Sequence, residues 1–179
     1  LINIKTDDTS LLCTTGKTGR EMFEIDDIKN NFYMIGSMGC ISSLALGLSL
    51  NSQKKSIVID GDGSLLMRMG NLPTIGYYNP SNILHLLLDN NSHDSTGGQF
   101  TVSENTNFVE LAKNSGYDLS HEVNSLKELE LAVVKWRQDP KLTFIRYKIS
   151  KGSKSDLGRP TKSPTEIAER FKNFINDGK

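Results

Sequence analysis

The sequence predicts a doubly wound α/β fold, in which helices cover both faces of a parallel sheet. Several short runs rich in Ile, Val, Leu and aromatic residues are largely apolar, as is typical of strands buried on both sides. Helical patterns fall between these runs, and this alternation indicates parallel strands joined by right-handed crossovers. The expected strands cover residues 10–14, 32–35, 56–60, 82–89 and 142–149.

The predicted helices follow these strands in order along the chain. Within one of them, Leu126, Leu129, Val133 and Trp136 recur at helical spacing, and Ser125 before them is a suitable N-cap. This pattern predicts an amphipathic helix with one face on the sheet. The full set of expected helices covers residues 19–29, 41–51, 64–78, 107–116, 125–138 and 164–176.

The segments that follow the strands are the places to look for a functional site. In doubly wound sheets, ligands bind outside the carboxyl ends of the strands. Four such segments are rich in Gly, Ser, Thr, Asn or Asp, which are residues that expose backbone or offer oxygen atoms. They cover residues 14–19, 36–40, 61–64 and 90–99.

Composition excludes several classes of function. The 21 Lys and Arg residues balance 21 Asp and Glu residues, so neither nucleic acid nor an anionic membrane surface is expected as a partner. No apolar run approaches the roughly 20 residues of a membrane-spanning helix. Cys13 and Cys40 lie in apolar surroundings and are interpreted as small buried side chains. This cysteine usage fits a reducing cytoplasm.

Residues 14–19 read Thr-Thr-Gly-Lys-Thr-Gly and contain part of a nucleotide-binding loop. That motif also needs a glycine five positions before its Gly-Lys pair, and Leu11 occupies this position. We therefore reject nucleoside triphosphate binding and interpret residues 14–19 as a strand-to-helix turn that lines the cleft.

Residues 61–64, Gly-Asp-Gly-Ser, form a candidate metal and phosphate site together with Asn90. Asp62 follows one strand and Asn90, 28 residues later, follows the next. A carboxylate, an amide oxygen and a main-chain carbonyl are ligands suited to Mg²⁺ or Ca²⁺. Gly61 and Gly63 let backbone approach a phosphate, and Ser64 is expected to begin a helix whose N-terminus attracts anions. Taken alone, the four residues also fit a tight turn.

This combination, Gly-Asp-Gly-Ser followed by Asn-Asn, resembles the thiamine diphosphate-binding motif. Four segments strengthen the likeness, and together they resemble the C-terminal half of phosphonopyruvate decarboxylases. Sulfopyruvate decarboxylase beta subunits are the nearest rival. The resemblance runs from about Leu11 to Pro164, and the segments that carry it are 14–24, 32–40, 88–99 and 155–164.

The resemblance implies a domain organisation and a set of cofactor contacts. Residues 1–150 would form the diphosphate-binding domain of the thiamine diphosphate fold. Residues 151–179 would form a C-terminal loop and helix, packed on it or extending from it. Gly36, Ser37 and Met38 match the segment that holds the aminopyrimidine, where the Gly36 carbonyl accepts the 4′-amino group and Met38 enforces the bent cofactor conformation.

The resemblance also implies a magnesium ion that links the diphosphate to the protein. Its ligands would be Asp62, Asn90 and the main-chain carbonyl of Ser92. In the family, the asparagine ligand comes two residues after the last apolar residue of the strand. Leu88 is that residue here, which favours Asn90 over Asn91.

The activity implied is magnesium- and thiamine diphosphate-dependent decarboxylation of 3-phosphonopyruvate to phosphonoacetaldehyde and CO₂. In the family, a glutamate of a separate pyrimidine-binding domain activates the cofactor, and nothing in this chain resembles that domain. We therefore expect a partner subunit or an N-terminal half to supply it, in a homo- or hetero-oligomer. Two alternatives stay open: 3-sulfopyruvate as the substrate, and a cofactor-binding half that is inactive alone.

His93 and Thr96 are the candidate catalytic residues. Thr96 lies six residues after Asn90, where many thiamine decarboxylases carry an acid, and a hydroxyl there would tolerate an anionic substrate tail. A flexible turn over residues 95–99 is the alternative. The ordinary pKa of histidine suits His93 to proton transfer or cofactor contact, although capping of a turn fits equally well. Arg159 is suited to binding a phosphonate or to forming a surface salt bridge.

Overall fold

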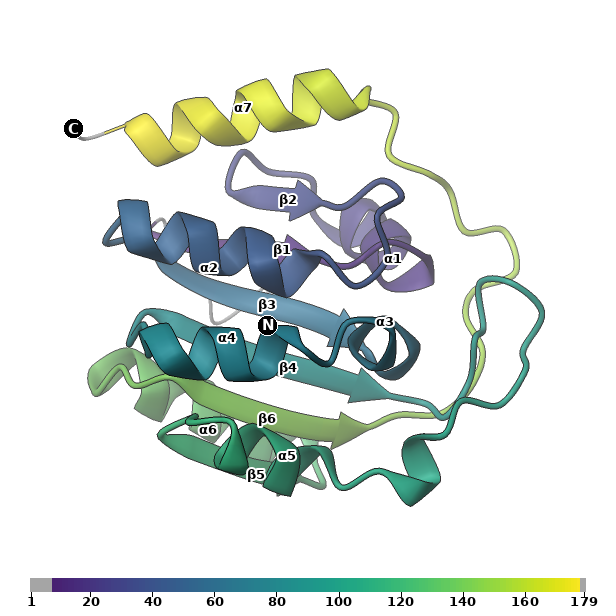
Figure 1. Ribbon diagram of the computed structural model, residues 1–179. Coiled ribbons are helices and arrows are strands. Elements are labelled where there is room, and N and C mark those ends of the chain that lie inside the picture. The colour runs from purple at the N-terminus through teal and green to yellow at the C-terminus, as the bar shows by residue number, and fades with distance from the viewer. Residues whose placement is uncertain (1–7, 178–179) are drawn as a thin grey trace.

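The computed structural model describes residues 8–177, in which six parallel strands form one sheet in the order β2-β1-β3-β4-β6-β5 (Figure 1). Every neighbouring pair is parallel, which confirms the predicted fold class. The strands are β1 (Thr9–Cys13), β2 (Asn31–Tyr33), β3 (Lys55–Gly61), β4 (Ile83–Asp89), β5 (Leu119–Val123) and β6 (Thr143–Lys148).

Helices cover both faces of the sheet. The α2, α4 and α5 helices lie on one face and α1 and α6 on the other (Figure 1). Side chains alternate across a strand, so Leu12 joins the core of the first face and Leu11 that of the second. The helices are α1 (Lys17–Ile25), α2 (Ile41–Asn51), α3 (Asp62–Met67), α4 (Asn71–Tyr78), α5 (Phe108–Asn114), α6 (Leu126–Gln138) and α7 (Pro164–Asn176), with a 3₁₀ helix η2 (Ser103–Asn105).

The structure differs from the predicted elements in two places. Strand β5 was not expected, because its sequence is polar and it pairs on one side only, with β6. His121 therefore lies in an edge strand. The single helix expected over residues 64–78 is two helices, α3 and α4. The Asn71 side chain donates to the Gly39 carbonyl and the Ser42 hydroxyl, which fixes the start of α4 against α2.

The N-cap expected at Ser125 is confirmed, because its side chain accepts the Glu128 N–H. The apolar face of α6 is buried through Leu129, Val133 and Trp136, whereas Leu126 is largely exposed. Cys13 is fully buried, but Cys40 is partly exposed at the start of α2.

The chain order creates a crevice at the carboxyl end of β1 and β3. From β1 the chain moves outward to β2 and then returns past β1 to β3, so the connections after β1 and β3 leave in opposite directions. This reversal is where doubly wound sheets bind ligands. β1 is followed by residues 14–16, and β3 is followed directly by the start of α3. Both lie in segments that the sequence predicted to be functional, 14–19 and 61–64.

The C-terminal segment crosses the carboxyl end of the sheet before it forms α7. Figure 1 shows this linker beside the loop that follows β4, and Gly152 N–H donates to Asp94 Oδ2 at 2.7 Å between them. Ile167, Phe171 and Phe174 of α7 are buried in the core. The predicted regions 1–150 and 151–179 include residues 1–7 and 178–179, which lie outside the described residues. Among those described, no helix combines the length and hydropathy needed to cross a membrane.

Candidate cofactor and substrate site

Two adjoining cavities lie at the carboxyl end of the sheet. The inner cavity, of about 120 Å³, is bordered by Asp62, Asn90 and His93. The outer cavity, of about 390 Å³, is bordered by Arg20 and Arg159. Because five residues line both, the two cavities are parts of one cleft; these residues are Thr15, Gly16, Met38, Ser95 and Thr96.

The fold brings most of the predicted site residues together. Those that line the inner cavity are Met38, Gly61, Asp62, Gly63, Ser64, Asn90, Ser92, His93 and Thr96. Gly36 and Ser37 line neither cavity and lie in the exposed loop that precedes α2. Both have a left-handed backbone, with φ of 72° and 48°, and Gly36 N–H donates to the Thr15 hydroxyl at 3.3 Å. That contact joins their loop to the rim of the cleft.

Asp62 is a buried carboxylate that is only 3% exposed. Its Oδ2 accepts a hydrogen bond from the Thr101 hydroxyl at 2.5 Å, and no basic side chain among residues 8–177 forms an ion pair with it. Burial raises the pKa of Asp62, and the neighbouring Asp89 carboxylate raises it further. A bound cation would offset both effects.

The two asparagines after β4 make different contacts. Asn90 Oδ1 accepts the Ser92 N–H at 3.1 Å, while its amide nitrogen lies 3.3 Å from Asp94 Oδ2. Asn91 has a left-handed backbone with φ of 52°, and its Oδ1 lies 3.1 Å from the Thr101 hydroxyl. Asn90 therefore lines the cavity within a local turn, whereas Asn91 points to the residue that contacts Asp62.

Thr101 and Ser103 supply hydroxyl protons to two oxygens of this region. The Thr101 hydroxyl donates to Asp62 Oδ2 and lies 3.1 Å from Asn91 Oδ1, which also accepts the Ser103 hydroxyl at 3.1 Å. Among the described residues, no group of three or more His, Cys, Asp or Glu side chains could hold a metal. A cation beside Asp62 would therefore also need amide and main-chain oxygens, which these loops supply. The donor set fits a hard ion such as Mg²⁺.

A buried ion pair supports the turn that carries the asparagines. Asp89 Oδ2 accepts hydrogen bonds from Arg146 Nε at 2.8 Å and Nη2 at 2.5 Å. Its other oxygen, Oδ1, accepts the Asn91 N–H at 3.1 Å. The guanidinium on β6 thus fixes the carboxylate on β4, and the carboxylate fixes the backbone at Asn91.

Glycine at position 63 allows His93 to pack closely on the start of α3. A Cβ atom there would lie 2.7 Å from the His93 ring and 3.3 Å from the Met38 methyl group. His93 and Met38 therefore meet over this glycine at the boundary of the two cavities.

Ser64 has a different position from the one expected. The helix begins at Asp62, so Ser64 lies inside its first turn. Its hydroxyl lies 2.9 Å from Thr14 Oγ1 and accepts the Gly39 N–H at 3.1 Å. Ser64 therefore joins three loops of the site to one another.

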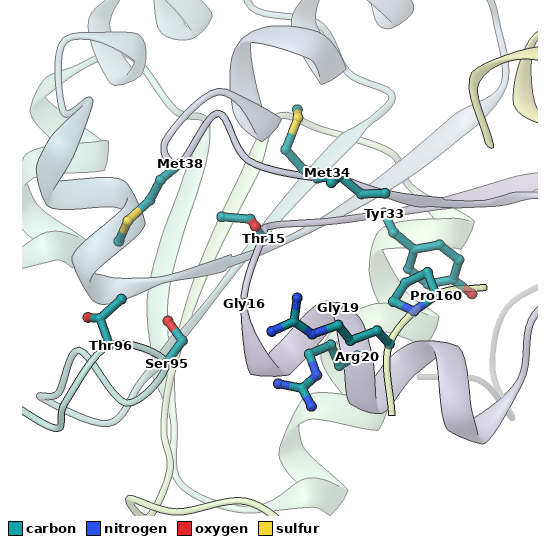
Figure 2. Close-up of a pocket in the computed structure, with 12 residues that line it drawn as sticks. Thr15, Gly16, Gly19, Arg20, Tyr33, Met34, Met38, Ser95, Thr96 and Pro160 are labelled. Carbon is teal, nitrogen blue, oxygen red and sulfur yellow. The ribbon is translucent and has the colours of Figure 1, made fainter. Parts of the chain in front are cut away.

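Residues 92–100 form a hairpin that closes one side of the cleft. Ser92 and Phe100 form an antiparallel bridge, and His93 N–H donates to the Gln99 carbonyl at 2.8 Å. The Thr96 hydroxyl lies 3.4 Å from the His93 carbonyl within this hairpin. Figure 2 shows Ser95 and Thr96 on one side of the outer cavity and Arg20 on the other.

Comparison with known proteins agrees with this site. Residues 15–147 match the model of the C-terminal TPP binding domain of thiamine pyrophosphate enzymes. The chain belongs to this family. The family expected from the Gly-Asp-Gly-Ser and Asn-Asn segments is therefore confirmed, and thiamine diphosphate is the cofactor of this domain.

The thiamine pyrophosphate enzyme domain has close curated relatives. A phosphonopyruvate decarboxylase of Streptomyces viridochromogenes is 41% identical over 94% of this chain and 42% of that protein. A sulfopyruvate decarboxylase beta subunit of Methanococcus maripaludis is 38% identical over 94% of this chain and 90% of that protein. This chain thus spans less than half of the first relative and nearly all of the second.

Solved structures support the fold. The Rhodococcus jostii thiamine diphosphate-dependent 4-hydroxybenzoylformate decarboxylase has a TM-score of 0.70 at 17% identity, over 85% of this chain and 31% of that chain. The benzoylformate decarboxylase of Polynucleobacter necessarius has a TM-score of 0.69 at 16% identity, over 85% and 32%.

Sequence reasoning missed two residues of this site, Thr101 and Asp89. Thr101 follows a hairpin whose closure cannot be read from residue types. Asp89 ends a strand in a run that was interpreted only as apolar, although a carboxylate beside two asparagines was a usable signal.

Proposed function

We propose that this chain is the diphosphate-binding half of an enzyme that decarboxylates 3-phosphonopyruvate to phosphonoacetaldehyde and CO₂, with thiamine diphosphate and Mg²⁺. The observation that carries the proposal is the cleft itself. A buried carboxylate and the amide of Asn90 border its inner part, and arginines and hydroxyls border its outer part. The identity to a phosphonopyruvate decarboxylase over 94% of the chain supports the same assignment.

In this proposal, Asp62, Asn90 and the Ser92 carbonyl hold the magnesium ion. Gly61 and Gly63 allow close approach of the diphosphate, because neither presents a side chain. Gly36, Ser37 and Met38 hold the aminopyrimidine, and Met38 reaches the cleft from their loop. Thiamine diphosphate, when bound, supplies the electron sink for loss of CO₂ from a 2-keto acid.

Asn91 is a second candidate for the amide ligand. Its Oδ1 lies at the Thr101 hydroxyl that also contacts Asp62 Oδ2. Each amide oxygen already accepts a hydrogen bond, Asn91 Oδ1 from the Ser103 hydroxyl and Asn90 Oδ1 from the Ser92 N–H. The variants Asn90→Gly and Asn91→Gly distinguish the two, because glycine tolerates both backbone conformations. The ligand is the residue whose loss weakens Mg²⁺ affinity more, measured by calorimetry in excess thiamine diphosphate.

His93 and Thr96 act on the substrate side of the cleft in this proposal. His93 transfers a proton or contacts the cofactor, and its packing on Gly63 beside Met38 supports this role. Thr96 presents a hydroxyl where a carboxylate would repel an anionic substrate. Thr96→Glu is expected to lower kcat/KM for the phosphonate substrate more than for pyruvate. Equal effects on the two substrates would contradict the role of Thr96.

The remaining parts of the enzyme come from outside this chain. We propose that a pyrimidine-binding domain or subunit supplies the activating glutamate, in a homo- or hetero-oligomer. The two unpaired cysteines, Cys13 and Cys40, favour a reducing cytoplasm as the location.

Sulfopyruvate decarboxylation is a second candidate function. It is favoured by the match to nearly the full length of the Methanococcus maripaludis beta subunit. The test is CO₂ release from phosphonopyruvate, sulfopyruvate and pyruvate, by the assembled enzyme with thiamine diphosphate and Mg²⁺. We expect the highest kcat/KM for phosphonopyruvate. Preference for sulfopyruvate would select the second candidate, and an equal rate with pyruvate would overturn both.

A further inference from the structure

The outer cavity has the chemistry of an anion-binding site. Its lining contains two guanidinium groups, Arg20 and Arg159, and no carboxylate. The hydroxyls of Thr15, Ser95 and Thr96 also border it. Cations and hydroxyl donors without a competing acid favour a ligand that carries negative charge.

The two arginines have different tasks. Arg20 Nε donates to the Gly158 carbonyl at 2.6 Å, and its Nη2 donates to the Leu157 carbonyl, so this side chain binds the linker. Arg159 is exposed, and no hydrogen bond or ion pair forms to it within residues 8–177. Its guanidinium is therefore available to a ligand in the outer cavity.

The backbone around Arg159 is held on both sides. Gly158 N–H donates to Glu24 Oε1 at 2.5 Å, and a Cβ at position 158 would lie 2.9 Å from that oxygen. Leu157 is buried, and Pro160 restricts the backbone that follows. The linker therefore presents Arg159 from a fixed turn, which reduces the entropy lost when a ligand binds.

Two acids that contact the linker, Glu24 and Asp94, are already occupied. Glu24 accepts the Gly158 N–H and lies 3.5 Å from Lys154 Nζ. Asp94, which borders the inner cavity, accepts the Gly152 N–H at 2.7 Å. Both carboxylates bind the linker, so neither competes for Arg159.

We propose that the outer cavity binds the tetrahedral acid group on carbon 3 of the 2-keto acid, and that Arg159 is its specificity-determining residue. This proposal rests on the proposed function. It assigns a binding site to the acid group by which the substrate differs from pyruvate. A phosphonate and a sulfonate share the required oxyanion, and a planar guanidinium donates two parallel hydrogen bonds to either.

The position of the outer cavity explains why it serves the substrate. Asp62 and the two glycines beside it border the inner cavity alone, and Arg159 borders the outer cavity alone. Met38 lies at the boundary. A molecule that spans this boundary can thus place its reacting end toward the inner cavity and its acid tail at Arg159.

The test uses the assembled enzyme and compares Arg159→Met, Arg159→Lys and the control Lys154→Met. Lys154 is a cation on the same linker that borders neither cavity. We expect Arg159→Met to lower kcat/KM for phosphonopyruvate or sulfopyruvate by about 10- to 100-fold and that for pyruvate by less than about threefold. Arg159→Lys should recover part of the loss, because it keeps the charge but not the planar fork.

A binding measurement provides a second readout that needs no turnover. The dissociation constant of 3-phosphonopropionate, which lacks the keto group, should rise at least about tenfold in Arg159→Met and remain unchanged in Lys154→Met. If the unmodified enzyme acts on neither acidic substrate, the proposed function fails. If it does act on one of them and Arg159→Met retains the substrate ratio and the dissociation constant, only the role of Arg159 is overturned.

Discussion

Replacing Arg146 with methionine is expected to destabilise the protein strongly and to weaken the proposed metal site. Arg146 lies on β6 and binds Asp89 on β4 through two hydrogen bonds to one carboxylate oxygen. The side chains are only 12% and 2% exposed. Methionine keeps much of the apolar stem but leaves the carboxylate buried without a cation.

The magnitude follows from these contacts. Each hydrogen bond between charged groups contributes about 1.5–3 kcal/mol, and breaking a buried pair by removing one partner costs about 3–5 kcal/mol. The guanidinium also lies 5.7 Å from the Phe108 ring centroid, which adds about 0.5 kcal/mol. We therefore expect the free energy of unfolding to fall by about 3–5 kcal/mol.

Urea unfolding measures this loss, with Lys148→Met as the matched control. Lys148 is also on β6 and pairs with Glu122, an acid that Arg146 contacts at 3.2 Å. The Lys148 pair is longer, at 3.7 Å, and its lysine side chain is 62% exposed. Its replacement should cost less than about 0.5 kcal/mol. Adding Asp89→Asn to Arg146→Met should recover part of the loss, because it removes the unpaired charge.

The same variant tests the link to the cofactor site. Asp89 holds the Asn91 N–H, so loss of Arg146 should release this turn and lower Mg²⁺ affinity by about 10- to 100-fold. The reasoning is refuted if Arg146→Met costs no more than the control. An unfolding loss with unchanged Mg²⁺ affinity would refute the link alone.

Two further predictions concern stability. Gly76→Ala should lower the free energy of unfolding in urea by about 3 kcal/mol or more, because the new Cβ would lie 1.7 Å from the Ser115 carbonyl oxygen. Gly47→Ala, in open space on α2, should instead raise it by about 0.5–1 kcal/mol. Equal effects of the two substitutions would contradict this reasoning. Burial and Lys135 lower the pKa of His121 below 6.5, so the unfolded chain binds its proton first and stability should decrease as the pH falls below 6.5. His121→Gln should lose this part of the pH dependence, and an unchanged pH profile would be evidence against it.

The central strands were predictable because their composition reflects burial on both faces. Runs such as residues 56–60 and 82–89 are apolar because each strand packs under helices on two sides. Strand β5 lacks this signal, since it is an edge strand and its Leu119 is 40% exposed. A polar edge strand therefore has no hydrophobic pattern by which it could be distinguished from a loop.

The outer cavity was less predictable, because contacts between distant segments create it. Arg20 and Gly158 are 138 residues apart, and Glu24 and Gly158 are 134 apart. No local pattern specifies that one turn of α1 binds the linker after β6. The sequence offered Arg159 either a phosphonate or a surface salt bridge, and the salt-bridge reading finds no support among the described contacts.

The inner cavity shows which part of a candidate metal site can be inferred from sequence. Gly61 of β3 lies opposite Leu88 of β4, so Asp62 and the asparagines must emerge side by side once the two strands are neighbours. The choice between Asn90 and Asn91 depends on a left-handed residue and on a hydroxyl ten positions further along the chain. Spacing can therefore identify the pair of loops, but the orientation of each amide is decided by the turn and by Thr101. The Thr101 hydroxyl donates to Asp62 Oδ2 and the Ser103 hydroxyl donates to Asn91 Oδ1, so two residues that follow the hairpin orient the oxygens of both loops.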